Sequence, residues 1–262
     1  MDHPVSELWT TARDAIRALA AADGELRRFG ASQHRYELAP PLSAAALAEL
    51  ETRLGATLPE DLRALATELG AGGGGPGYGI VPLDRAAGCV VVAPGGVPWR
   101  RGLPLAHLGC GYLAVAALDG DARGEVWIDA RAIGVIRPIH ASATALYLDW
   151  IDRLAHARWP EAHVPPGACA LAAALSGYLA RCEADAGAPA GTLAGQALRE
   201  ALSRLGPGAI EIAAESAVAW FDDGDRVDPC IACARLIETL AGDGLRGDVV
   251  ARGALPKPLR DA

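Results

Sequence analysis

Before position 70, apolar residues recur every three or four positions, which is the spacing of helices that bury one face. This pattern predicts a first helix over residues 5–22. Ser43 is a typical N-cap for a second helix, which Gly55 would end. Pro59 suits the first turn of a third helix, because the two acidic residues after it would lie near the positive end of the helix dipole.

After a glycine-rich loop at residues 70–79, the pattern changes to alternating and β-branched segments. Four strands are predicted, over residues 89–93, 112–118, 125–129 and 133–139. The short connections between them favour antiparallel pairing, because parallel strands need long crossovers. A helix over residues 142–159 is expected to follow. This order predicts an α+β fold in which helices pack on a mainly antiparallel sheet.

The proline- and glycine-containing residues 163–167 are typical of a linker. Beyond them the pattern predicts helices over residues 168–184, 193–205 and 229–241, with short extended segments at 209–213 and 248–252. We therefore expect a first domain over residues 1–162 and a helix-rich α/β extension over residues 163–262. The pattern does not indicate a role for the extension.

Composition and charge narrow the classes of protein and partner. A chain that is 51% hydrophobic and 21% charged is typical of a globular protein and not of a disordered one. No apolar stretch approaches the roughly 20 residues of a membrane-spanning helix, and the start lacks a basic segment followed by an apolar run. We therefore expect a cytoplasmic protein with no membrane partner. The net charge of −8 disfavours nucleic acid and favours a basic protein partner.

Cys230 and Cys233 are the only close pair among the six cysteines. A structural zinc site would need further ligands, and Cys169 and Cys182 are poor candidates because the sequence between them is helical. A redox pair would need a preceding strand, where the chain has a proline instead. Because the pair shares one helical face with later apolar residues, we expect buried thiols and no metal or cofactor. The alternative is a metal or enzyme site within residues 165–262.

The sequence lacks the common motifs of catalysis. The glycine-rich loop at residues 70–79 follows a helix and contains no lysine, so it does not fit a phosphate-binding loop. The chain has no Gly-x-Ser-x-Gly elbow, and its histidines are scattered without the spacing of metal ligands. We therefore expect no enzyme activity, and we expect several loop glycines to adopt positive φ in tight turns.

Two blocks of residues carry a family resemblance. The first comprises residues 34–42, 58–61 with Leu65, and 70–83, and the second comprises residues 108–112, 123–129 and 147–151. In order and spacing these blocks resemble the SUKH superfamily, which groups fungal cell-wall assembly regulators with many bacterial immunity proteins. The resemblance covers about residues 1–160.

The resemblance implies a non-enzymatic protein-binding module, which in bacteria neutralises a cognate toxin by direct binding. The alternative is an intracellular regulatory scaffold that binds a host protein. The residues expected to contact the partner are Tyr78, Trp99, Arg100, Arg101, Glu125 and Trp127. Trp127 lies in the middle of a predicted strand, where a tryptophan typically packs in the core, so burial is the alternative interpretation for this residue. Asp222, Asp223 and Asp225 fit either a solvated turn or a contact patch for a basic partner.

Overall fold

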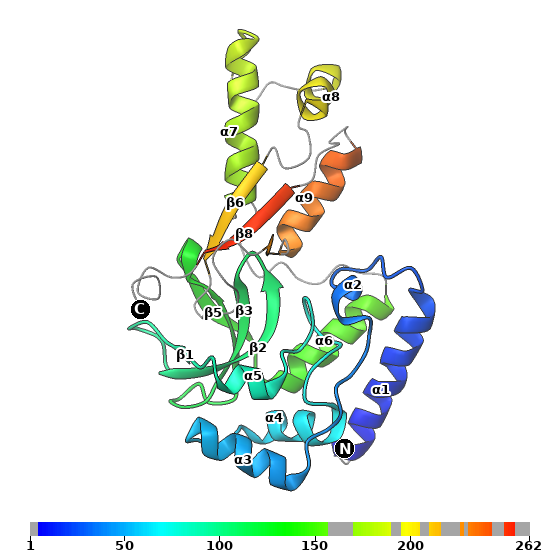
Figure 1. Cartoon of the computed structure of the whole chain (residues 1–262), viewed down its shortest axis with the longest axis vertical. Helices are drawn as coiled ribbons and strands as arrows, with labels where there is room; N and C mark the ends of the chain where they lie inside the picture. The colour runs from blue at the N-terminus through cyan, green and yellow to red at the C-terminus, as the bar shows by residue number, and fades with distance from the viewer. Residues whose placement is uncertain are drawn as a thin grey trace. The chain divides into compact units, whose positions relative to one another are not determined.

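The computed structural model describes residues 5–156, 170–189, 195–204, 210–215, 226–227, 230–242 and 249–254. Residue contacts divide the chain into two units. The first consists of Met1–Leu108 and Tyr112–Glu161, and the second consists of Gly109–Gly111 and Ala162–Ala262. The described residues form an α+β fold whose main sheet is antiparallel, as the sequence pattern predicts (Figure 1).

The first unit begins with helices whose ends follow local sequence signals. α1 (Val5–Ala22) has its predicted bounds, and it packs against α6 (Ala143–Ala155). Ser43 caps α3 (Ala44–Leu54), since its Oγ accepts a hydrogen bond from the Ala46 N–H at 3.2 Å. The other helical segments are α2 (Ala31–His34), α4 (Glu60–Ala64), its π-helical continuation η1 (Leu65–Leu69) and α5 (Leu83–Ala87).

The sheet of the first unit has five strands that lie side by side in sequence order. They are β1 (Val91–Val92), β2 (Arg101–Gly109), β3 (Tyr112–Ala117), β4 (Val126–Ala130) and β5 (Val135–His140), with the short helix η2 (Arg131–Ile133) before β5. β4 pairs antiparallel with β3 and β5, and it places Trp127 opposite Val115. The sequence pattern missed β2, because Pro104 and a run of buried residues break the alternation of a half-buried strand.

The core of the first unit is built from the sheet and the inner faces of its helices. Every residue of β3 is buried, and Leu62, Leu65 and Leu83 are almost wholly buried on the segments α4, η1 and α5. Trp9 of α1 meets Tyr147 of α6 edge to face, with ring centroids 6.1 Å apart. Burial of one large apolar side chain contributes about 1.5–3 kcal/mol, so these contacts hold the helices on the sheet.

The glycine-rich loop at residues 70–79 is a packed part of the first unit. The predicted positive φ is confirmed at four of its glycines, with φ of +151° at Gly72, +95° at Gly73, +62° at Gly77 and +106° at Gly79. Gly73 and Ile80 exchange two backbone hydrogen bonds of 2.9 and 2.7 Å. A Cβ on Gly73 would lie 2.2 Å from the carbonyl oxygen of Glu37, so only glycine fits there.

The described part of the second unit contains the helices α7 (Ala170–Asp185), α8 (Gly195–Ser203) and α9 (Ile231–Gly242). Its sheet has the strand order β6 (Ile210–Glu215), β8 (Val249–Ala254), β7 (Arg226–Val227). β6 and β8 are parallel, whereas β7 is antiparallel to β8. The predicted linker at residues 163–167 lies outside the described residues. No helix among the described residues is long and apolar enough to cross a membrane.

Candidate functional site

Trp99 and Trp127, which the sequence analysis expects to contact a partner, are buried in the first unit. Trp99 is 2% exposed and Trp127 is 7% exposed, and their rings meet edge to face with centroids 6.1 Å apart. Gly102 leaves room for Trp99, since a Cβ there would lie 3.0 Å from its ring. The Trp127 Nε1–H donates to Glu125 Oε2 at 3.1 Å. These contacts place both rings in the core, and because a binding anchor needs accessible surface, contact of either ring with a partner stays a prediction.

Arg100 and Arg101 have different surroundings although they are adjacent. Arg100 is exposed, and its backbone N–H and that of Arg101 both donate to Asp119 Oδ1, at 2.6 and 3.2 Å. The Arg101 side chain donates to the carbonyl oxygen of Leu54 at the end of α3. Arg101 therefore connects β2 with α3, and only Arg100 presents its side chain to solvent.

Tyr78 is half-buried between two rings. Its ring centroid lies 5.0 Å from that of Phe29 and 5.6 Å from that of His107. Burial lowers the pKa of His107 to about 4, so this imidazole is neutral at physiological pH. Tyr78 therefore holds the glycine-rich loop against β2 and keeps part of its ring accessible. The acidic residues Asp222, Asp223 and Asp225 lie outside the described residues.

A groove of about 930 Å³ opens along α4 and η1 in the first unit. Its charged lining residues are Glu60, Asp61, Arg63, Glu68 and Arg123, and we refer to it as the acidic groove. Leu8 of α1 and Ala64 of α4 give it an apolar portion. The sequence pattern does not indicate this groove, because its walls come from segments that lie far apart in the sequence.

The two arginines of the acidic groove already have acceptors. Arg123 donates to the carbonyl oxygens of Thr57 and Leu58 at 3.0 and 3.1 Å. Arg63 lies 3.4 Å from Glu51 Oε1. In contrast, the Oε2 atom of Glu68 is buried and has no hydrogen-bond partner among the described residues. Because Glu68 lines the groove, a rotation of its side chain would turn this oxygen toward a cationic hydrogen-bond donor there.

A cluster of three cysteines lies in the second unit. The Sγ atoms of Cys110, Cys230 and Cys233 all lie within 4.8 Å of one another. The predicted burial of Cys230 and Cys233 is confirmed, at 2% and 1% exposed. The local pattern around the pair does not indicate Cys110 as a third member, because Cys110 precedes Cys230 by 120 residues. The available signal in the sequence is its position between two glycines, Gly109 and Gly111.

Comparison of the chain with protein-family models, with curated proteins and with solved structures finds no match. The resemblance to the SUKH superfamily therefore rests on the residues of the two sequence blocks.

Proposed function

We propose that this chain is a protein-binding module that protects a bacterial cell by binding a cognate toxin directly. The acidic groove carries this proposal, because the carboxylates of Glu60, Asp61 and Glu68 line it and the buried Oε2 atom of Glu68 has no donor among the described residues. A buried acceptor without a donor costs free energy, and a partner recovers it by supplying the donor once the Glu68 side chain rotates into the groove. The SUKH-like sequence blocks support the same function, since that superfamily includes bacterial immunity proteins.

The chemistry of the acidic groove favours an arginine or lysine side chain of the toxin as its occupant. The methylene stem of such a side chain can lie on Leu8 and Ala64 while its charged end reaches Glu68. Glu60, which is exposed on the same groove, adds a second negative charge. The net charge of −8 also favours a basic partner, because it attracts positive charge over a longer range than the groove does.

The exposed part of the β1–β2 connection supplies a second contact. Val92 at the edge of the sheet is 70% exposed, which is unusual for a large apolar side chain in this unit. Arg100, at the other end of the connection, is also exposed. The side chains of Val92 and Arg100 are accessible to a partner in this segment, whereas that of Trp99 is buried.

The test requires a toxin gene beside the gene of this chain, and it is co-expression of the intact chain with the toxin domain that such a gene encodes. Cells that produce both proteins are expected to grow, whereas cells with the toxin alone stop growing. The double variant Glu60→Gln with Glu68→Gln is expected to bind the purified toxin domain at least about tenfold more weakly, a loss of about 1.4 kcal/mol. The measurement is titration calorimetry on the purified proteins.

A matched control distinguishes weaker binding caused by the groove from weaker binding caused by the change in net charge. The double variant Glu49→Gln with Asp84→Asn also removes two negative charges, at exposed positions of α3 and α5 that do not line the groove. It is expected to bind within about twofold of the unaltered chain, because neither side chain lines the groove and exposed charges that do not contact the partner contribute little to affinity. Equal losses in both variants would exclude the groove. Growth that co-expression does not restore would exclude the immunity function and favour the regulatory scaffold.

A further inference from the structure

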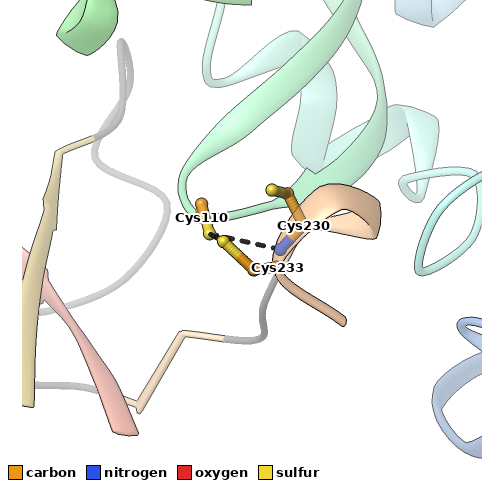
Figure 2. Close-up of side chains that lie close together, drawn as sticks. All are labelled: Cys110, Cys230 and Cys233. Atoms are coloured by element: carbon orange, nitrogen blue, oxygen red, sulfur yellow. Dashed lines mark hydrogen bonds between the residues drawn. The ribbon is translucent and has the colours of Figure 1, made fainter. Parts of the chain in front are cut away.

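The three cysteines of the second unit come from two segments that lie far apart in the sequence. Cys110 belongs to the turn Gly109–Gly111, which residue contacts assign to the second unit. Cys230 immediately precedes α9, and Cys233 lies in its first turn. Figure 2 shows the sulfur atoms of Cys110 and Cys233 turned toward one another. They are 3.7 Å apart, which is well beyond the roughly 2.05 Å of a disulfide bond.

The backbone conformation of both segments brings the three sulfur atoms within 4.8 Å of one another. Cys110 has φ of +52°, and its neighbours Gly109 and Gly111 have φ of +85° and +77°. A non-glycine residue adopts this left-handed conformation at a cost, so the turn holds a side chain where a third glycine would fit more easily. Cys230 and Cys233 are three residues apart at the start of a helix, which places them on one face.

The surroundings of the cluster stabilise negative charge on sulfur. The backbone N–H of Cys230 donates to Cys110 Sγ at 3.2 Å, as the dashed line in Figure 2 marks. Cys230 and Cys233 lie at the N-terminal end of the 12-residue helix α9, where the helix dipole favours anions. Thiolates are the form in which cysteines bind metal ions, and backbone N–H donors and helix N-termini both favour that form.

The separations of the sulfur atoms match tetrahedral coordination of zinc. Zn–S bonds of about 2.3 Å in a tetrahedron place two sulfur atoms about 3.8 Å apart. The Cys110–Cys233 separation of 3.7 Å already has this value, and the limit of 4.8 Å for the other pairs leaves about 1 Å to close on binding. Three sulfur ligands also select a soft or borderline ion over magnesium or calcium, which prefer oxygen.

We propose that Cys110, Cys230 and Cys233 bind one Zn²⁺ ion as thiolates. The ion takes the three sulfur atoms and has one tetrahedral position left for a further ligand. Each thiol that binds releases its proton to solvent, so no oxidant or reductant is needed. This site replaces the expectation from the sequence that the Cys230–Cys233 pair packs without a metal, because Cys110 supplies the third ligand.

The test begins with the intact chain, purified under reducing conditions and stripped of metal with a chelator. Titration with Zn²⁺ against a chromophoric chelator is expected to give one equivalent per chain. Co²⁺ is expected to give the intense visible absorption of a tetrahedral site together with sulfur-to-cobalt charge transfer in the near ultraviolet. Zinc is expected to raise the temperature of unfolding of the stripped chain, because a ligand that binds only the folded state stabilises it.

Cys110→Ser is the decisive variant, because a substitution in a half-buried turn disturbs packing less than one at a buried position. Cys110 is half-buried, whereas Cys230 and Cys233 are buried. Loss of a residue that only supports a metal ligand lowers metal affinity by about 10–100-fold. Because Cys110→Ser removes a ligand itself, its zinc affinity is expected to fall by more than this. Cys182→Ser, on α7 of the same unit, is the matched control and is expected to keep the affinity of the unaltered chain. Circular dichroism of both variants confirms that they are folded.

Three results would overturn the proposal. The first is less than one equivalent of zinc on the folded, reduced chain. The second is equal zinc affinity in Cys110→Ser and in the unaltered chain. The third is a Cys110–Cys233 disulfide that persists under the reducing conditions of the titration, which mass mapping of peptides would detect, because sulfur atoms in that bond cannot serve as thiolate ligands.

Discussion

His34 lies among aromatic rings in the first unit and is held as a neutral imidazole. Its Nδ1 accepts a hydrogen bond from the Tyr36 backbone N–H at 3.0 Å, and its ring meets those of Tyr36 and Trp150 edge to face. Burial lowers the pKa of His34 from 6.5 to about 4, although the negative charge of Asp23 acts in the opposite direction. The folded chain therefore accepts a proton here only at a pH well below that of the unfolded chain.

This difference predicts a loss of stability in mild acid. Between pH 6.5 and pH 4 the unfolded chain binds more protons at His34 than the folded chain does. The contribution of His34 is complete well above pH 6.5, and it falls by about 2 kcal/mol between about pH 7 and about pH 5. His34→Asn keeps an acceptor for the Tyr36 N–H and removes the titration. Urea unfolding at both pH values should show a loss about 2 kcal/mol smaller in this variant, and equal losses would contradict the assignment.

At the scale of elements, the glycine-rich loop at residues 70–79 depends on backbone contacts that exclude a side chain. At Gly73 a Cβ would collide with the Glu37 carbonyl oxygen, and its φ of +95° is unfavourable for other residues. Gly73→Ala is therefore expected to lower the free energy of unfolding by at least about 2 kcal/mol. The measurement is urea unfolding of the intact chain at neutral pH.

Gly95→Ala is the matched control for this loop. A Cβ at Gly95 would meet nothing within 4 Å, and its φ is not positive. The substitution is expected to be neutral or to stabilise the chain by up to about 1 kcal/mol, because it restricts the unfolded state. If the two alanine variants were equally stable, the loop would tolerate side chains and the packing described for it would be wrong.

For the whole molecule, the excess of 32 acidic over 24 basic residues predicts how salt affects partner binding. Association with a basic toxin domain is expected to slow as ionic strength rises from about 0.01 M to about 0.15 M, because the Debye length shrinks from about 30 Å to about 8 Å. Dissociation depends on short-range contacts and is expected to change much less. Stopped-flow measurement of both rates checks this, and an association rate independent of salt would contradict charge-guided encounter.

Much of the first unit could be predicted from its sequence, because the signals act over a few residues. The periodic apolar positions of α1, the Ser43 cap of α3 and the positive φ of the loop glycines depend on local backbone geometry. β3, β4 and β5 also lie within two residues of their predicted bounds, since alternation and turn residues are equally local signals.

Tertiary structure decided the features on which the two proposals depend. Trp99 comes from a proline- and glycine-rich connection that the sequence presents as exposed, yet packing against Trp127 buries it. The acidic groove gathers Glu68 and Arg123 from segments 55 residues apart, and the turn that holds Cys110 lies 120 residues before Cys230. Composition and local pattern determined the fold class and the acidic charge. They did not determine which distant side chains meet, because the close packing of the folded chain sets those contacts.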